Sequence, residues 1–273
     1  MYRTIWKECH SSVCSIHFLS KAGTRIITFT GFRIRDYLIT DDIIDKFTQP
    51  AKVYLRFTKE DGYTERAGKA MSYTAFKERI FHPGGKIVPG YVIIRLKDNE
   101  FKNIPSLKCS RKVDYEIGHP VAVLGYQLDK DNLAIKKGII SSFFTEQNSI
   151  NYIQVDASIK QGNAGSPVIE TENMEVIGVI GHHLASITHS YRRLMKIFNK
   201  NLSILKEVQG KYCFEELDPV QVLIANQNQI KHIATEFFKT ANMRVGFASE
   251  LCNLIDYCPD LDATMDLEVK QDG

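Results

Sequence analysis

The chain has 273 residues, 44% of them hydrophobic and 25% charged, so it is long enough to bury a full core and has the balance of a globular protein. Its 35 basic and 32 acidic residues leave a net charge of only +3, far from the strong positive charge that nucleic acids and anionic membranes attract. We therefore expect a protein or an extended peptide as the partner, with no nucleic acid and no membrane.

No targeting or metal-binding pattern stands out. The first ten residues lack the apolar run of a signal peptide, and no later run approaches the ~18 apolar residues of a membrane-spanning helix, so we expect a cytoplasmic protein. The six cysteines are scattered without a CxxC pair, which favours reduced structural thiols over disulfides or a zinc site. We expect no metal and no other cofactor.

The first part of the chain is rich in short β-strands. Residues 13–18 and 25–29 are mostly β-branched or aromatic and flank a Lys-Ala-Gly turn, which predicts a hairpin. Residues 30–34 and 36–40 continue the pattern. Many short strands separated by turn signals are typical of an all-β barrel.

A glycine-rich stretch, Gln-Gly-Asn-Ala-Gly-Ser-Pro at residues 161–167, lies between two apolar runs. Its two glycines let the backbone turn tightly with unobstructed N–H groups, as in an anion-binding nest or an oxyanion hole. From these seven residues alone, an ordinary glycine-rich hairpin loop is an equal alternative.

Residues 184–241 break the β pattern. Apolar residues recur at alternating spacings of three and four from Leu184 to Val208, which predicts one helix of about seven turns that ends at Gly210. Asp218-Pro219 is a helix start, and Leu223, Ile230, Ile233 and Phe237 repeat the apolar spacing. These two helices predict an antiparallel hairpin.

The run Asp-Ala-Ser-Ile-Lys-Gln-Gly-Asn-Ala-Gly-Ser-Pro at residues 156–167 resembles the trypsin-like serine proteases of the bacterial high-temperature-requirement type, whose pattern is Asp-Ala-x-Ile-x-x-Gly-Asn-Ser-Gly-Gly-Pro. Residues 113–126, 136–142 and 175–181 also resemble strands of that family. The resemblance implies a mainly β fold: a double six-stranded antiparallel β-barrel with the helical hairpin inserted and a C-terminal helix at 249–257. The expected divisions are 1–183 for the first part of the double barrel, 184–241 for the hairpin, 242–258 for the last strand and closing helix, and 259–273 for a flexible acidic tail.

The same resemblance places the catalytic triad on three residues that cannot perform its chemistry. Ala164 takes the position of the nucleophilic serine, Ile43 that of the general-base histidine, and Gly90 that of the orienting aspartate. In the family, serine attacks, histidine takes its proton, and aspartate holds the histidine. Three losses together predict a protein that no longer cleaves.

Other family positions carry over with less change. By resemblance, the backbone N–H groups of Gly162 and Ala164 form a vestigial oxyanion hole. Ser158 takes the specificity-pocket position, where no carboxylate is present to select a basic side chain. A basic cluster on the first predicted helix is a candidate partner-binding surface, although a solvated helix face is the favoured explanation: Arg192, Arg193, Lys196 and Lys200.

These features predict a catalytically inactive trypsin-like protein that works as a peptide-binding or protein-binding adaptor or regulatory subunit, with self-association through the hairpin as a further expectation. Two alternatives stay open. The chain is an active serine endopeptidase captured with its nucleophile changed to Ala164, or it is an accessory of a bacterial defence or signalling system.

Overall fold

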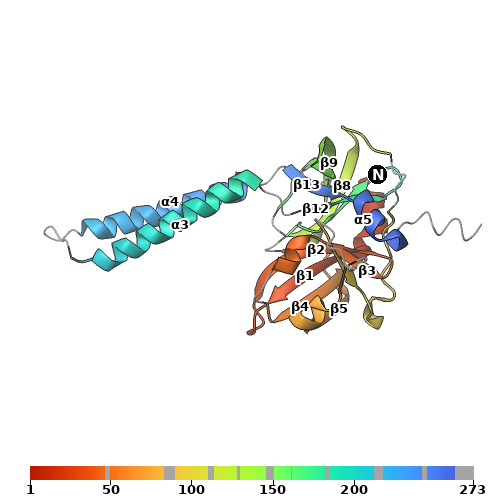
Figure 1. Ribbon diagram of the computed structural model, residues 1–273, viewed down its shortest axis with the longest axis horizontal. Helices are drawn as coiled ribbons and strands as arrows, with labels where there is room; N and C mark the ends of the chain where they lie inside the picture. Colours follow the sequence, from red (N-terminus) through yellow and green to blue (C-terminus); the bar gives the residue numbers. More distant parts are fainter. Residues whose placement is uncertain are drawn as a thin grey trace, which may run out of the picture. The chain divides into compact units, whose positions relative to one another are not determined.

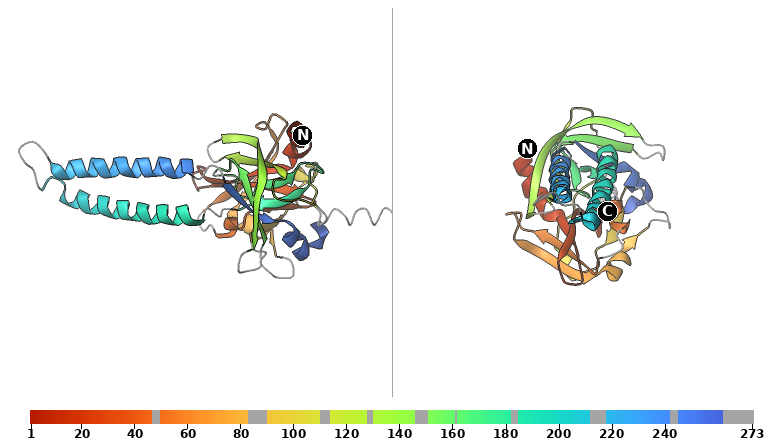
Figure 2. Two further views of the ribbon diagram at one scale, coloured as in Figure 1. Left: turned by 90° about the horizontal axis from the view of Figure 1, so that it is seen from above. Right: turned by 90° about the vertical axis from the view of Figure 1, so that its left-hand side faces the viewer.

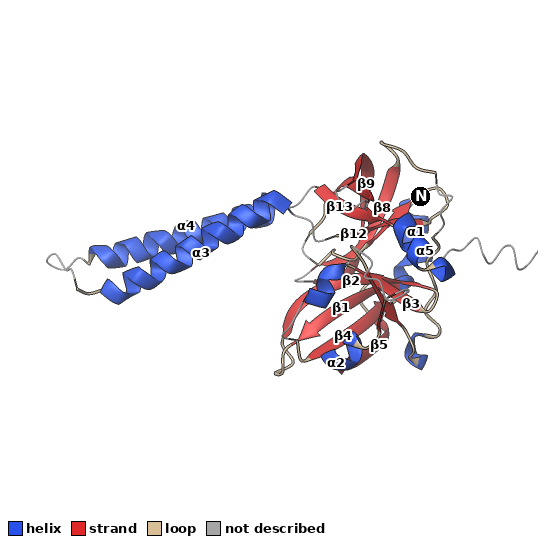
Figure 3. Ribbon diagram, in the orientation of Figure 1, coloured by secondary structure: helices blue, strands red, loops and turns tan. Residues whose placement is uncertain are grey.

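The computed structural model describes residues 1–46, 50–82, 90–109, 114–127, 130–145, 151–160, 162–181, 185–211, 218–241 and 245–261. The chain divides into two compact units (Figure 1), one formed by residues 1–182 and 244–273 and the other by residues 183–243. The first unit is built mainly of strands and the second is a pair of helices (Figure 3). No helix among the described residues is both long and apolar enough to cross a membrane.

The first half of the larger unit is a seven-stranded antiparallel sheet in the order β5-β4-β1-β2-β3-β7-β6. Its strands are β1 (Val13–Leu19), β2 (Arg25–Ile34), β3 (Tyr37–Thr40), β4 (Lys52–Thr58), β5 (Glu65–Ser72), β6 (Ile80–Phe81) and β7 (Val92–Arg95). The helices α1 (Tyr2–Cys9) and α2 (Tyr73–Lys77) accompany them, and a short 3-10 helix, η2 (Asp42–Lys46), follows β3. The expected closed six-stranded barrel is therefore wrong in detail, because the two-residue strand β6 pairs with β7 and extends the sheet.

The second half is the closed six-stranded antiparallel barrel that the sequence predicts, in the order β10-β13-β12-β11-β8-β9. Its strands are β8 (Pro120–Gln127), β9 (Lys130–Thr145), β10 (Asn151–Ala157), β11 (Pro167–Glu170), β12 (Val176–Ile180) and β13 (Val245–Glu250). The helix α5 (Cys252–Tyr257) follows the last strand, as expected for a closing helix. Pro259–Leu261 form a 3-10 turn with Leu261 buried, so these residues do not belong to the expected flexible tail, whose remainder lies outside the described residues.

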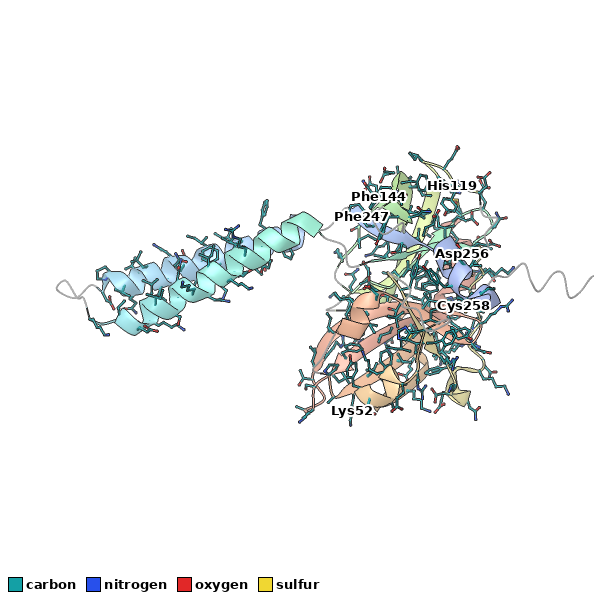
Figure 4. The ribbon with its side chains drawn as sticks, in the orientation of Figure 1. Lys52, His119, Phe144, Phe247, Asp256 and Cys258 are labelled. Carbon is teal, nitrogen blue, oxygen red and sulfur yellow. The ribbon has the colours of Figure 1, made fainter. Side chains whose placement is uncertain are left out.

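Three apolar clusters hold the larger unit together. One fills the first sheet, with Ile16, Phe18 and Leu55 fully buried. A second fills the closed barrel, where Val123, Ile153 and Val168 meet, and a third joins residues of both halves to α1 and α5. At one end of the barrel, Phe144 of β9 packs edge-on against Phe247 of β13, with ring centroids 5.6 Å apart (Figure 4).

The smaller unit consists of α3 (Ala185–Val208) and α4 (Pro219–Ala241), which run side by side (Figure 2). Asp218 caps α4 as expected, since its Oδ1 accepts the N–H of Val220 at 2.9 Å. Its Oδ2 accepts the N–H of Gly210 at 2.9 Å, and Gly210 has a φ of 78° that suits glycine. One aspartate thus joins the two helix ends.

The predicted apolar contacts of the second helix are wrong. Leu223, Ile230, Ile233 and Phe237 are 50–73% exposed. The side of α4 that faces α3 carries other residues, including the buried Val220 and the half-buried Phe238, whose ring stacks on Tyr191 with centroids 4.0 Å apart. Apolar residues occupy two adjacent sides of α4, so spacing alone could not tell which side contacts α3.

Candidate functional site

The glycine-rich loop lies between β10 and β11 and is bonded to strands of both halves of the larger unit. The N–H of Thr30 on β2 donates to the carbonyl of Ala164 at 2.9 Å, and the Thr30 hydroxyl donates to the carbonyl of Gly162 at 2.8 Å. The same hydroxyl accepts the N–H of Tyr126 on β8 at 2.9 Å. Thr30 therefore fixes the loop to β2 and β8 at one point.

Asn163 stabilises the loop from inside. Its side chain is fully buried, donates to the carbonyl of Tyr126 at 2.7 Å and accepts the N–H of Lys160 at 2.8 Å. The Nζ of Lys136 on β9 also donates to the Asn163 side chain. Burial and, to a smaller extent, the positive charge of the nearby Lys160 together lower the pKa of Lys136 to about 8.

Gly165 is the closest point between the loop and the first sheet. Its φ is 84°, and a Cβ there would lie 1.9 Å from the carbonyl oxygen of Thr30 and 2.3 Å from the hydroxyl of Thr40. The N–H of Gly165 donates to the carbonyl of Ile180 at 2.7 Å. No side chain fits at this position without moving the backbone of β2.

Two backbone N–H groups of the loop have no partner in these hydrogen bonds. The N–H groups of Asn163, Gly165 and Ser166 each have a carbonyl acceptor. Within the described part of the chain, no acceptor is recorded for the N–H of Gly162 or of Ala164, although both residues are buried. Buried residues of folded proteins rarely leave a backbone N–H without an acceptor, so these two N–H groups are candidate donors to an oxygen atom from outside the loop.

The three residues expected at the triad positions from the sequence lie in apolar or closely packed surroundings. Ala164 belongs to the apolar cluster of the first sheet, and the half-buried Ile43 packs against that same cluster. Gly90 has a φ of 82°, and a Cβ there would lie 2.4 Å from the hydroxyl of Ser249. An aspartate at Gly90 would require the hydroxyl of Ser249 to move and would adopt a backbone conformation that favours glycine.

Nearby polar groups do not replace the triad. Asp41 is buried, and its Oδ1 accepts the N–H of Ile43 at 2.7 Å, so it caps η2. Ser166, two residues after Ala164, is fully buried with its hydroxyl against Gly125 of β8. His82 is exposed at the end of β6. Among the described residues, no histidine or carboxylate is hydrogen-bonded to the hydroxyl of a serine in this loop.

The remaining predicted residues lie apart from these positions. Ser158, expected in the specificity pocket, is exposed just after β10, while the adjacent Ile159 is buried against Gly246 of β13. Arg193, Lys196 and Lys200 are exposed on α3, in the other compact unit, and the side chain of Arg192 lies outside the described residues. Sequence patterns did not indicate a role for Lys136 or Thr30, because both contact the loop only once distant strands have come together.

Comparison with known proteins agrees with this geometry. The family model of the trypsin-like peptidase domain matches residues 37–179, which include β3, the η2 turn and the whole glycine-rich loop. The chain belongs to the trypsin-like peptidase domain family. No curated protein matches significantly.

Solved structures of trypsin-like proteases resemble this family member at low identity. A serine endoprotease from Yersinia pestis is 18% identical with a TM-score of 0.49, over 66% of this chain and 57% of that one. The HtrA-type protease AlgW, solved as a variant with a tripeptide, is 16% identical with a TM-score of 0.49, over 66% and 54%. An inactive serine-to-alanine mutant from M. tuberculosis is 18% identical with a TM-score of 0.46, over 65% and 77%. The chain thus spans less than two thirds of the first two structures.

Proposed function

We propose that this trypsin-like protein binds an extended peptide or protein segment without cleaving it, as an adaptor or regulatory subunit. The observation that carries the proposal is the pair of N–H groups at the buried residues Gly162 and Ala164, which have no acceptor among the described residues. A buried N–H without an acceptor costs about 1–3 kcal/mol. A carbonyl or carboxylate oxygen of a bound segment would remove that cost.

The charge around the loop supports an oxygen ligand. Lys136 contacts the side chain of Asn163, the residue between the two unpartnered donors, and Lys160 lies in the same loop. Both lysines carry positive charge when protonated, which favours the partial negative charge of a carbonyl or the full charge of a carboxylate. This is a binding role, in which nothing needs to be activated.

The residues around the N–H groups of Gly162 and Ala164 support the absence of cleavage in this proposal. Peptide hydrolysis in this family needs a nucleophile, a general base that takes its proton, and a group that orients the base. The side chains of Ala164 and Ile43 lie in an apolar cluster, and a carboxylate at Gly90 would require the side chain of Ser249 to move. An oxyanion hole without these groups retains only a modest rate advantage over water.

Selection from a displayed peptide library on the immobilised full chain tests the proposal. We expect a recurrent peptide motif, and we expect Ala164→Leu to weaken binding of the selected peptide at least tenfold by filling the space at the two donors. Ala22→Leu, the same change in an exposed turn of the β1–β2 hairpin, is the matched control and should bind like the original chain. Failure to select any motif, or equal binding by a folded Ala164→Leu variant, would overturn the proposal.

A further inference from the structure

We propose that the helical hairpin is half of a four-helix bundle, and that a second copy of this chain supplies the other half. This goes beyond the peptide-binding proposal and does not depend on it. Eight of the fifteen exposed large apolar side chains among the described residues lie on α3 and α4, a concentration that a solvated pair of helices does not require.

Seven of these eight exposed apolar residues follow one rule on both helices; the exception is Val222, which precedes the exposed Leu223. Each of the seven stands immediately before a residue on the side that contacts the other helix: Ile197 precedes the buried Phe198, Ile230 precedes Lys231, whose Nζ donates to Asn199 at 2.7 Å, and Phe237 precedes Phe238. One residue of an α-helix turns the side chain by about 100°. The exposed residues are therefore displaced from the contact side by about a quarter turn, in the same rotational sense on each helix.

This shared sense places both sets on one side of the hairpin. The helices are antiparallel, so their chains turn in opposite directions when both are viewed from the same end. Equal displacement along each chain then brings the two sets of side chains to the same side of the pair. We call this side the second apolar face; it comprises Leu194, Ile197, Ile204, Leu223, Ile230, Ile233 and Phe237, which are 39–73% exposed.

The area of the second apolar face is suited to a second copy. A large apolar side chain carries on the order of 150 Å² of surface, so these partly exposed residues offer roughly 550 Å² per hairpin. Two hairpins would bury about 1,100 Å² before flanking polar side chains are counted, close to the lower end of stable protein interfaces. Helices of 24 and 23 residues are long enough for the layers of such a bundle.

A polar group next to the face lacks a partner within one copy. The Oε1 of Gln227 is buried and has no hydrogen-bond donor among the described residues. Gln227 lies four residues after Leu223 of the face on α4, and Asn201 lies four residues after Ile197 of the face on α3. A second copy related by two-fold symmetry brings another Gln227 and another Asn201, whose amide N–H groups are suitable donors. Single polar positions of this kind fix the register of helical bundles.

The flanking charges indicate which helices would meet. Arg193 and Lys200 are exposed on α3 next to the face, whereas Asn226 and Gln229 occupy the corresponding flank of α4 and carry no charge. Packing α3 against the second copy's α3 would bring like charges together, which is unfavourable. We infer that each α3 packs against α4 of the other copy.

Sedimentation equilibrium of the full chain, at about 50 µM because a small interface supports only micromolar affinity, tests the inference. We expect a dimer, and we expect the double variant Ile230→Glu and Phe237→Glu to be a monomer with unchanged helix content, since both positions are already exposed. The double variant Gln221→Glu and Ala225→Glu adds the same charge on exposed positions away from the face and should stay dimeric.

Three results would overturn the inference. The original chain could be monomeric at this concentration, the face variant could stay dimeric, or the control could dissociate as completely as the face variant. A monomeric chain that pellets with phosphatidylglycerol vesicles, and loses that binding in the face variant, would assign the second apolar face to a membrane surface instead. Because these variants leave the glycine-rich loop unchanged, peptide binding measured on the same samples separates this inference from the proposed function.

Discussion

In the glycine-rich loop, backbone groups are bonded to β2 and β12 and the Asn163 side chain to β8, whereas α3 and α4 meet through apolar and aromatic side chains with few hydrogen bonds between them. The loop has one permitted shape, because glycine conformation and a buried asparagine fix it. The pairing of α3 with α4 is determined by which side of each helix is apolar. Each helix also has a second apolar side that stays exposed. A loop of the first kind keeps its shape when a catalytic side chain is lost, since none of its bonds involves that side chain.

The strongest test of this difference is Gly165→Ala. The positive φ and the overlap of the new Cβ with the carbonyl of Thr30 should cost more than about 3 kcal/mol of the free energy of unfolding, measured by urea denaturation. Gly23 has a similar φ of 79° but nothing within 4 Å, so Gly23→Ala should cost only about 1 kcal/mol. Equal losses would contradict the close packing of the loop on β2.

Lys136 gives the loop a pH dependence. Its folded pKa of about 8 lies below the usual 10.5, so between these values the unfolded chain binds more protons, and stability contributed by this residue rises with pH. Lys136→Met should therefore be more stable than the original chain at pH 7, and the difference should shrink as the pH approaches 10. Urea denaturation at both pH values measures it. A difference that does not change with pH would refute the lowered pKa.

In the hairpin, the expected effect of a single polar change is smaller. Asp218→Ala removes the bonds to Val220 and Gly210 and should cost about 1 kcal/mol, as for other helix caps. Amide hydrogen exchange should show faster exchange in the first turn of α4 and no change in the strands. Asp218→Asn, which retains an acceptor oxygen, is the control and should lose less. Slower or unaltered exchange in Asp218→Ala would show that the cap does not stabilise the helix.

The smallest expected effect is that of Ala164→Ser on hydrolysis. Restoring a hydroxyl without a base should give no cleavage of fluorescent casein above the level of the original chain, because Ile43 cannot accept the proton. The fold should be unchanged, since the substitution adds one atom. Clear hydrolysis by Ala164→Ser would instead support an active endopeptidase whose nucleophile had been changed.

The sequence predicted features that depend on local chemistry. Turn residues and β-branched runs predicted the hairpin of β1 and β2 in the first sheet, and Asp218 with Pro219 predicted the start of α4. The side of α4 that contacts α3 could not be predicted, because Ile230 and Phe237 give the same periodic signal one position before the residues that make contact. The seventh strand of the first sheet was missed because two residues carry too little pattern.

Features of the site that depend on contacts between residues far apart in the chain also could not be predicted from the sequence. The closure of the Gly90 position rests on Ser249, which approaches only after the barrel has formed. The contact of Lys136 with Asn163 depends on which side of a sixteen-residue strand faces the loop. The glycines themselves were readable, but the two donors without acceptors became visible only when every neighbouring bond had been counted.

The order of the barrel strands has a consequence for how the chain folds. β13 pairs with both β10 and β12, yet it follows the helical hairpin in the chain. Until residues 245–250 leave the ribosome, β10 and β12 keep open edges that can pair with other chains. An antiparallel hairpin that folds early brings its two ends together, which reduces the entropy lost when β13 closes the barrel. The folded hairpin therefore lowers the entropic cost of closing the barrel, whereas an unfolded insertion of the same length would raise it.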